Sequence, residues 1–443
     1  MDIVSSYAVR IEKAGRKLFG ETERIYRDAV SFLISVCDKE WDALCVIKGS
    51  NERMHAAEHL VHATKQNTPV YCDFDSLFPQ MPSYLRRAAI HAALGAVSSY
   101  RSNLDNWITG GRKEKPPKLT CDRLLMPVFY NDQMYRQGDE PDTAYLKLYR
   151  NHDWMWVKVS LRHTDVRYLE KYWSHEKASA PTLERHHGKY RLRFAFTEKV
   201  TLSNKKPNYQ LICAVDLGLN TDAVCVIMDS QGTVAARKFI DFPAEKDSVW
   251  TVYGRIRRHM REHGPMSVKG LWCYARRLND EHAKKVGAAI ADFAFEHGAD
   301  VIVFEHLDFR GKKRRGSKAQ KLSQWRRNTI QEIASQRAHR LGIRISHICP
   351  WNTSRLAYDG SGRLERDPHN KALATFNTGK QYNADLNAAY NIGARYFVRE
   401  LLKSSPATMR SRILTEYPDA GRRTCATLHT LWQLRKVMAR ITV

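Results

Sequence analysis

Hydrophobic residues repeat with a helical period early in the chain and with the period of a strand elsewhere. Residues 3–11 predict one strand, and over residues 25–36 the apolar residues recur at steps of three and four, as one buried helix face requires. A second helix is expected over residues 83–107, with Ser83 as its cap after Pro82. The chain therefore begins with a strand that is followed by a helical module.

The glycines, prolines and lysines of residues 109–118, TGGRKEKPPK, mark a boundary. Beyond it, residues 123–135, 144–161 and 189–202 alternate apolar and polar side chains, as half-buried strands do. We expect a β-module here, in the form of a small barrel. Since one strand precedes the helices and several follow them, the helical module is expected to be an insertion in this β-module.

From residue 209 the pattern becomes that of an α/β domain. A strand over residues 209–215 leads to Asp216, and the chain turns through Gly218 and Asn220 into a second strand over residues 223–228. The run 301–304 is short and wholly apolar, as in a strand buried on both faces, and Glu305 follows it. Further strands are expected at residues 234–242 and 343–348, and helical regions at residues 249–285 and 324–341.

A helix start follows the polar, loop-like residues 351–382. In YNADLNAAYNIGAR, residues 382–395, Asn383 is a good helix cap, and Asp385 lies in the first turn, where the helix dipole favours an anion. The residues after 396 are again helical and basic.

Three carboxylates, Asp216, Glu305 and Asp385, stand at strand ends or at a helix start. Burying a carboxylate costs several kcal/mol unless a cation or hydrogen bonds compensate it. If the strands lie side by side, the three acids converge and can bind Mg²⁺ or Mn²⁺, which prefer oxygen ligands. Two such ions about 4 Å apart can activate water and stabilise the leaving oxygen in phosphodiester hydrolysis. The alternative for Asp216 is a turn carboxylate that only caps its own backbone.

The charge balance indicates a polyanionic partner. The chain has 72 Lys+Arg against 47 Asp+Glu, a net charge of +25, which most simply indicates nucleic acid; the alternative is a merely soluble basic protein. No apolar run of 18 residues and no signal-peptide pattern is present, so we expect no membrane partner and a cytoplasmic location. None of the nine cysteines forms a CxxC pair, so neither a disulfide framework nor a Cys-rich zinc site is indicated.

The motifs AVDLGLN, VIVFEHLDF and YNADLNAAYNIGAR, in this order, resemble the three RuvC motifs of transposon-encoded TnpB proteins and miniature type V CRISPR effectors. The segment between the second and third motifs resembles them too, with Trp325, a basic helix and GIRISHICPWNTS, residues 342–354. The specific resemblance covers about residues 209–397. The β-module with its inserted helices resembles the wedge and recognition regions of that family in layout only.

This resemblance implies a multidomain α+β and α/β protein, in which an RNase H-like (RuvC) nuclease domain follows a wedge-like β-barrel module with an inserted helical recognition module. The expected boundaries are 1–14 for the first strand of the wedge-like module, 15–110 for the recognition module, 119–207 for the wedge-like barrel, 208–349 for RuvC motifs I and II, 350–381 for a cysteine-free loop in place of a zinc ribbon, 382–397 for motif III and 398–443 for a basic helical tail.

The same resemblance implies an RNA-guided DNA endonuclease of prokaryotic origin, in which a guide RNA pairs with target DNA and the protein reads a short flanking DNA motif. Asp216, Glu305 and Asp385 would be its catalytic residues and the ligands of two Mg²⁺ or Mn²⁺ ions. It would serve antiviral defence if its guide comes from a CRISPR array, and it would lie at the nucleoid when bound to DNA. The source of the guide, from an array or a transposon end, and the choice between monomer and homo-oligomer stay open.

Candidate nucleic-acid contacts come from the basic residues that follow the second motif and from one arginine after Thr353 and Ser354. Residues 310–344 carry twelve Arg or Lys against the single Glu332, too one-sided for an ordinary solvated face. The candidates are Arg310, Lys312, Lys313, Arg314, Arg315, Trp325, Arg326, Arg327 and Arg355. For Arg355 the alternative is an ordinary loop arginine.

One departure from the family concerns zinc. The resembled proteins commonly place a four-cysteine zinc ribbon between the second and third motifs, where this chain reads RLAYDGSGRLERD and ALATFNTGKQ without a cysteine. We therefore expect no structural zinc, and a loop that is held by other means or is ordered by substrate.

Two other functions are compatible with the sequence. The first is an RNA-guided DNA-binding protein with little or no cleavage, against which the retention of all three acids argues. The second is an RNase H-like resolvase or transposase that acts without RNA, which would leave the long N-terminal modules and the basic excess unexplained.

Overall fold

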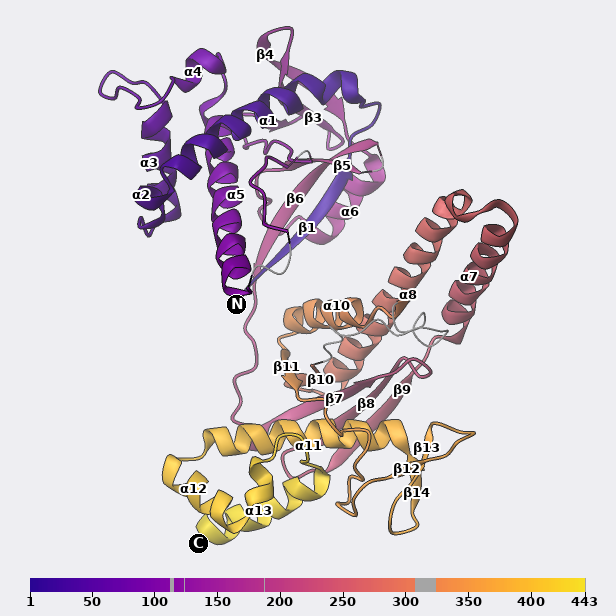
Figure 1. The fold of residues 1–443 in the computed structure, drawn as a ribbon. Coiled ribbons are helices and arrows are strands. Elements are labelled where there is room, and N and C mark those ends of the chain that lie inside the picture. Colours follow the sequence, from indigo (N-terminus) through magenta and orange to yellow (C-terminus); the bar gives the residue numbers. More distant parts are fainter. Residues whose placement is uncertain (112–114, 123, 187, 307–323, 443) are drawn as a thin grey trace. The chain divides into compact units, whose positions relative to one another are not determined.

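The computed structural model describes residues 1–111, 115–122, 124–186, 188–306 and 324–442. The chain divides into two units (Figure 1). The N-terminal unit runs from Asp2 to Lys199, and the C-terminal unit comprises Met1 and residues Val200–Val443. Among the described helices, none combines the length and the apolar character that crossing a membrane requires.

The N-terminal unit is built on a strand pair whose members lie far apart in the sequence. Strand β1 (Asp2–Arg10) pairs antiparallel with β6 (Lys189–Lys199) along its whole length, and β5 (Thr182–His186) lies on the other side of β6. The helices that follow β1 thus lie, in the sequence, between two strands that pair in the same sheet. The expected insertion of helices after one strand agrees with this pairing.

The predicted β-barrel is wrong. Strands β2 (Tyr135–Gln137), β3 (Thr143–Arg150) and β4 (Asp153–Ser160) form a second antiparallel sheet. Within the described residues, neither this sheet nor the first closes into a barrel. Isolated bridges such as Ile11↔Leu161 connect the two sheets, so no continuous ladder closes a barrel. Alternation of apolar and polar residues identifies strands but does not determine which strands pair.

Two strand boundaries in this unit also differ from the prediction. Most of residues 123–135 is irregular, because Pro127 and the turn at Asp132 (φ 65°) interrupt pairing, while Phe129 is still fully buried. The run 144–161 is a hairpin rather than one strand: its turn residues Asn151 and His152 have φ of 52° and 63°, the positive values that tight hairpin turns require.

The helices of the N-terminal unit pack their apolar faces against these sheets and against one another. Ser83 begins a long helix as predicted, but Pro82 occupies the cap position and no side chain caps the helix. These helices are α1 (Arg16–Lys39), α2 (Trp41–Cys45), α3 (Ser50–Val61), α4 (Phe74–Leu77), α5 (Ser83–Thr109) and α6 (His163–Trp173).

The C-terminal unit is organised around a five-stranded sheet. Its strand order is β11 (Arg344–Ile348), β10 (Val301–Glu305), β7 (Leu211–Leu217), β8 (Ala223–Asp229) and β9 (Val234–Ile240). The first three of these strands are parallel to one another, whereas β7, β8 and β9 form an antiparallel meander. The carboxyl ends of the neighbouring strands β7 and β10 therefore lie at the same end of the sheet.

Helices cover both faces of this sheet (Figure 1), which explains why β7, β8 and β10 are apolar on both sides. On one face lie α11 (Ala384–Ser404) and α13 (Leu428–Thr442), and on the other lie α8 (Lys269–Glu296) and α10 (Arg327–Arg340). The remaining elements are η1 (Pro207–Tyr209), α7 (Pro243–His263), η2 (Pro265–Val268), β12 (Glu365–Arg366), β13 (Leu373–Thr375), β14 (Gln381–Asn383), α12 (Ala407–Glu416) and η3 (Pro418–Gly421).

Helix α11 approaches the sheet closely at Gly393. A Cβ at this position would lie 3.0 Å from the Sδ of Met228 on β8 and 3.3 Å from the Cβ of Ala214 on β7. A larger residue at position 393 therefore requires α11 or the side chains of Met228 and Ala214 to shift by a few tenths of an ångström.

We expect Gly393→Ala to lower the free energy of unfolding of the C-terminal unit by about 1–3 kcal/mol, the usual cost of overpacking a core. Gly254, in the middle of α7, offers a matched control because no atom lies within 4 Å of a Cβ there. Gly254→Ala should stabilise the same unit by about 0.5–1 kcal/mol through helix propensity. Calorimetric unfolding of the full chain measures both, and equal shifts in the same direction would contradict the close packing at Gly393.

Candidate metal and nucleic-acid site

The three predicted acids lie on the α11 side of the sheet. Asp216 has the same orientation as Ala214 two residues earlier on β7, and Ala214 packs into the cluster under α11. Glu305 is the last residue of the neighbouring parallel strand β10. It is two residues after Val303 and so points to the same face of the sheet, where Val303 packs into the same cluster. Asp385 lies in the first turn of α11 itself.

Local sequence explains the position of Asp385. The Asn383 side chain caps α11 as predicted, because its Oδ1 accepts hydrogen bonds from the backbone N–H groups of Asp385 (3.0 Å) and Leu386 (2.9 Å). The cap fixes where the helix begins, and the helix start brings Asp385 within electrostatic reach of Asp216.

Burial and mutual repulsion make these acids hard to ionise without a cation. Burial, together with the neighbouring carboxylates of Glu305 and Asp385, raises the pKa of Asp216 well above its usual value. Burial likewise raises the pKa of Glu305 and of Asp385. Arg366 on β12 opposes the rise for Asp216 and Asp385, but an exposed arginine compensates only part of three partly buried charges.

A hydroxyl group supports Glu305 from the loop that follows β11. The Thr353 hydroxyl is buried and lies within hydrogen-bonding distance of Glu305 Oε1 and, at 2.9 Å, of the Pro350 carbonyl oxygen. When it donates to Glu305 it favours the ionised carboxylate and opposes the rise in its pKa, as Arg395 also does. Thr353 therefore helps to orient Glu305 from the loop that follows β11.

A row of polar side chains on α11 holds that loop in place. Asn387, Asn391 and Arg395 follow one another at four-residue steps on the helix and are all buried. Asn387 Nδ2 donates to the Leu356 carbonyl at 2.8 Å, and Asn391 Nδ2 donates to the Thr353 carbonyl at 3.0 Å. The row thus determines where Thr353 lies relative to Glu305.

Arg395 is the most connected member of this row. Its guanidinium donates to the backbone carbonyls of Cys349 (2.8 Å), Trp351 (2.7 Å), Thr424 (3.1 Å) and Ala426 (2.9 Å). It therefore ties the loop after β11 to the segment before α13, and its charge faces Glu305.

The predicted basic contacts fall into three groups. Arg310, Lys312, Lys313, Arg314 and Arg315 lie outside the described residues. Trp325 is partly buried against the cluster between the sheet, α8 and α10; Arg326 forms an ion pair with Asp280 at 2.9 Å; and Arg327 is the partly buried first residue of α10. These three serve the packing of the unit at least in part.

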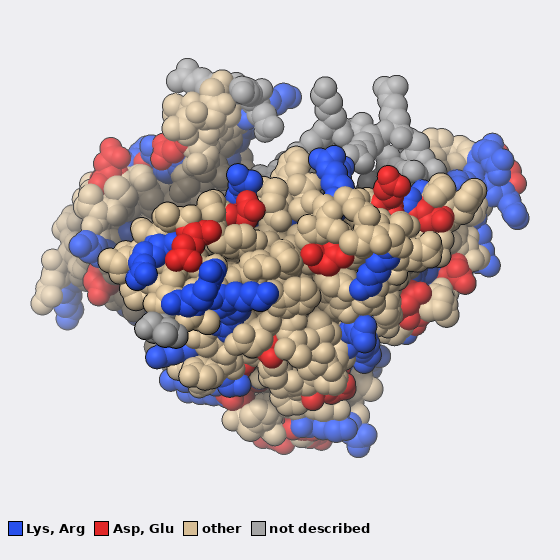
Figure 2. Space-filling view, turned by 90° about the horizontal axis from the view of Figure 1, so that it is seen from below, with Lys and Arg blue, Asp and Glu red and all other residues tan. Residues whose placement is uncertain are grey.

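Arg355 is exposed in a turn after Thr353, where its backbone N–H donates to the Asn352 carbonyl at 3.1 Å. In the part of the chain that the structure describes, its exposed side chain has no ion pair. Lys and Arg side chains are spread over the face shown in Figure 2, with acidic side chains among them. The positive excess on this face is therefore not confined to one patch.

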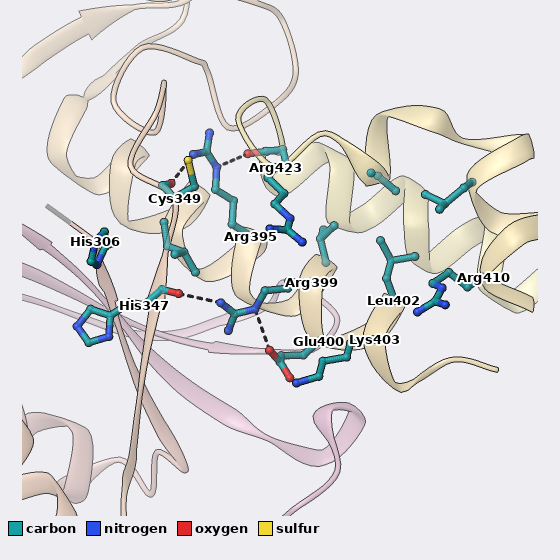
Figure 3. A pocket seen from close by; sticks show the side chains of 16 residues that line it. His306, His347, Cys349, Arg395, Arg399, Glu400, Leu402, Lys403, Arg410 and Arg423 are labelled. Atoms are coloured by element: carbon teal, nitrogen blue, oxygen red, sulfur yellow. Dashed lines mark hydrogen bonds and ion pairs between the residues drawn. The ribbon is translucent and has the colours of Figure 1, made fainter. Parts of the chain in front are cut away.

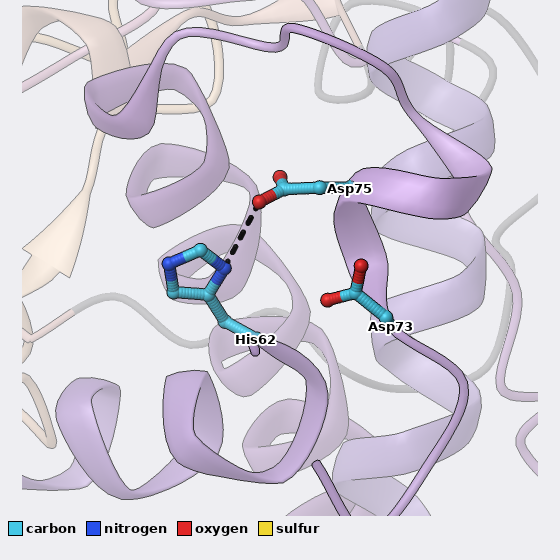
Figure 4. A group of neighbouring side chains, drawn as sticks. All are labelled: His62, Asp73 and Asp75. Atoms are coloured by element: carbon cyan, nitrogen blue, oxygen red, sulfur yellow. Dashed lines mark ion pairs between the residues drawn. The ribbon is translucent and has the colours of Figure 1, made fainter. Parts of the chain in front are cut away.

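A different group of side chains has the tightest spacing for a metal ion. Among the described residues, only His62, Asp73 and Asp75 have ligand atoms that all lie within 4.8 Å of one another (Figure 4). Their charges already have protein partners: Asp75 pairs with His62 at 3.1 Å and with Arg86 at 3.2 Å, and Asp73 accepts from the Ala63 N–H at 3.0 Å. This cluster is therefore explained as part of the N-terminal packing.

The ligand atoms of Asp216, Glu305 and Asp385 do not all lie within 4.8 Å of one another. Two divalent ions about 4 Å apart are surrounded by their carboxylate ligands, so a two-ion site does not require the three acids to lie in mutual contact. The donor set consists of oxygen atoms only and is partly buried, and since burial raises the pKa of all three acids, a cation would stabilise their ionised forms. The residues present thus fit Mg²⁺ or Mn²⁺.

Contributors to the site that were not assigned a role from the sequence are Thr353, Arg366, Asn387, Asn391 and Arg395. The signal for three of them was present, because asparagine and arginine at four-residue steps on an otherwise apolar helix are unusual and need buried partners. Arg366 lies on a two-residue strand, which no periodicity can reveal.

Comparisons with known proteins agree with this architecture. The sequence model of the Aq_aa04 family matches residues 5–150. No curated protein matches the chain. Among solved structures, the mini-RNA-guided endonuclease CRISPR-Cas_phi3 superposes with a TM-score of 0.53 at 11% identity, covering 88% of this chain and 92% of that one.

Two further structures give lower scores. The Cas12f1–sgRNA–target DNA complex has a TM-score of 0.48 at 15% identity over 88% of this chain and 98% of that one. CasPhi-2 (Cas12j) bound to crRNA has a TM-score of 0.43 at 12% identity over 88% and 97%. The chain therefore has a mixed α+β fold similar to that of the CRISPR-Cas_phi3 structure.

Proposed function

We propose that this protein is an RNA-guided DNA endonuclease whose cutting site is formed by Asp216, Glu305 and Asp385. The observation that carries the proposal is the convergence of three partly buried carboxylates, from two parallel strands and a capped helix, on one face of a sheet. The fold shared with a structure described as an RNA-guided endonuclease supports the same function.

The three carboxylates would hold two Mg²⁺ or Mn²⁺ ions, which would supply the positive charge that activates water and stabilises the leaving oxygen. Asp216 and Glu305, on adjacent strands, would face the ions from the sheet, and Asp385 from the helix. Thr353 and Arg395 would keep Glu305 ionised and oriented. Arg366, which acts electrostatically on two of the acids, would contact the scissile phosphate from β12.

In this proposal the sheet with its covering helices, residues 208–349 and 382–397, is the RNase H-like (RuvC) nuclease domain. Residues 1–14 and 119–207 form a wedge-like module without a closed barrel, residues 15–110 the recognition module, residues 350–381 the cysteine-free loop and residues 398–443 the basic tail. Guide RNA and target DNA are the partners, a short flanking DNA motif is read, and no structural zinc is required.

The test begins with the RNA that co-purifies with the full chain. Sequencing this RNA gives the guide, and a plasmid library with the matching target and randomised flanking bases gives the substrate. We expect cleavage in Mg²⁺ that EDTA abolishes and that restored Mg²⁺ or Mn²⁺ recovers, since the acids need divalent ions. Target binding without cleavage under all metal conditions would indicate an RNA-guided binding protein instead, and the absence of bound RNA together with cleavage would indicate an RNA-independent nuclease.

A further inference from the structure

A basic cavity lies beside the Glu305 end of the sheet. Its volume is about 860 Å³, a size suited to a nucleotide-sized ligand. The walls come from the ends of β10 and β11, from α11 and α12, and from the segment after η3 (Figure 3). Five arginine or lysine side chains line the cavity against one carboxylate, Glu400.

Two of these five cations are already engaged by the protein. The guanidinium of Arg395 donates hydrogen bonds to backbone carbonyls. Arg399 donates to the His347 carbonyl at 2.7 Å, to Ser346 Oγ at 2.7 Å and to Glu400 at 2.8 Å. Glu400 is thereby neutralised by Arg399. These side chains shape the cavity wall and leave little charge for a ligand.

The other three cations, Lys403, Arg410 and Arg423, are exposed and form no ion pair in the part of the chain that the structure describes. They come from three successive segments, α11, α12 and the segment after η3, and all three line the one cavity (Figure 3). Like charges around one cavity repel one another unless an anion lies between them. The arrangement is therefore suited to a multiply charged anion from outside the chain.

Apolar side chains also line the cavity, among them Val398, Leu402 and Leu414. A free phosphate would gain nothing from this surface, whereas the sugar and base of a nucleotide would be desolvated by it. The combination of spaced cations and apolar wall favours a nucleic-acid strand over an inorganic anion.

Two residues of the cavity wall are neighbours of Glu305. His306, which lines it, directly follows Glu305, and Arg395, which also lines it, faces Glu305 with its charge. The cavity therefore begins close to Glu305, the member of the acidic site on β10.

We propose that Lys403, Arg410 and Arg423 bind the phosphates of the single-stranded DNA segment that extends from the bond cut at Asp216, Glu305 and Asp385. The assignment of DNA rests on the proposed function, because the strand that enters the acidic site is the one that is cut. The binding itself rests on the cavity alone.

The first experiment measures binding directly in EDTA, where no cleavage occurs. The full chain is mixed with a single-stranded DNA oligonucleotide, exposed lysines are acetylated, and the modified positions are mapped by mass spectrometry. We expect the DNA to protect Lys403 several-fold, while Lys436, an exposed lysine on α13 outside the cavity, is unchanged. Equal reactivity of Lys403 with and without DNA would overturn the proposal, and protection by RNA but not DNA of the same sequence would overturn the assignment of DNA.

The second experiment uses two charge-matched variants. Lys403→Gln/Arg410→Gln/Arg423→Gln removes three cavity cations, and Arg257→Gln/Arg258→Gln/Arg261→Gln removes three exposed cations from α7, away from the cavity. Three lost phosphate contacts should reduce the slope of log affinity against log salt by about 2 for single-stranded DNA, since each contributes about 0.7. Equal slopes for the two variants would show that binding follows total charge and would overturn the proposal.

Cleavage kinetics separate this inference from the proposed function. With the guide bound, the cavity variant should raise KM about tenfold or more while kcat stays near the wild-type value, because it removes binding and not chemistry. A wild-type KM in the cavity variant would overturn the inference. If the wild-type protein does not cleave under any condition, the proposed function fails, and the lysine protection and salt slopes still decide whether the cavity binds DNA.

Discussion

Asp216→Asn is expected to reduce target cleavage by more than ~10²-fold while guide RNA binding is retained. Loss of an outer partner of a metal ligand alone costs about 10–100-fold, so loss of a ligand that lies between two other carboxylates should cost more. Asparagine keeps the shape of the side chain and removes its charge. The measurement is the single-turnover cleavage rate of the guide-loaded protein in saturating Mg²⁺.

The same variant has a second, independent readout in thermal unfolding. Because Asp216 is hard to ionise at its buried position, Asp216→Asn should unfold in EDTA at the wild-type temperature or above it. Mg²⁺ at a hundred times its Kd should stabilise the wild-type protein by about 2.7 kcal/mol, and this stabilisation should disappear in the variant. Unchanged stabilisation by Mg²⁺ would show that Asp216 is no metal ligand.

Asp292 provides the matched control for this substitution. It lies on α8, over the opposite face of the sheet, and forms a partly exposed ion pair with Arg337. Asp292→Asn should leave cleavage and Mg²⁺ stabilisation within a factor of about two of wild type, as expected for an exposed pair. Parallel losses in both variants would point to a general effect of charge rather than to the site.

The second large effect is expected for Arg395→Met. This side chain is 4% exposed and donates to four backbone carbonyls, so its removal leaves several buried acceptors without a donor. We expect a loss of roughly 3–5 kcal/mol in the free energy of unfolding of the C-terminal unit, the range found when a buried charged partner is deleted. Methionine fills a similar volume, so the effect reports hydrogen bonding more than packing.

The loop after β11 should loosen in the same variant. Its amides at Leu356 and Tyr358 are bonded to Asn352 and Asn387, and hydrogen exchange there should speed up before the sheet opens. Arg412→Met, at an exposed position of α12, is the control and should change stability by no more than about 0.5 kcal/mol. Unaltered exchange in the loop of Arg395→Met would mean that the row of polar side chains on α11 does not hold it.

The sequence was sufficient to predict the central elements of the C-terminal unit. An apolar run that ends in a carboxylate has a simple physical meaning, and both β7 with Asp216 and β10 with Glu305 follow it. The cap of α11 was predictable for the same reason, because the preference for Asn383 is local and does not depend on distant residues.

Features that depend on distant partners were not predictable in this way. The alternation in β3 and β4 indicated strands, but the open sheets in place of a barrel depend on which edges meet. The loop between residues 351 and 382 contains three strands of two or three residues, too short for any periodicity. The role of Arg395 depends on carbonyls that lie 29 to 46 residues away in the chain.

The pairing of β1 with β6 has a consequence for biosynthesis. Partners such as Asp2 and Lys199 lie almost two hundred residues apart, so β1 leaves the ribosome long before β6 exists. At about 5–20 residues per second, the first strand waits roughly 10–40 s for its partner. During that interval its backbone is an unpaired edge that other nascent chains could join. Rapid folding of the intervening helices would shorten the length of flexible chain between β1 and β6 and so speed up their pairing. The inserted helices would then assist the assembly of the sheet, in addition to any contact with nucleic acid.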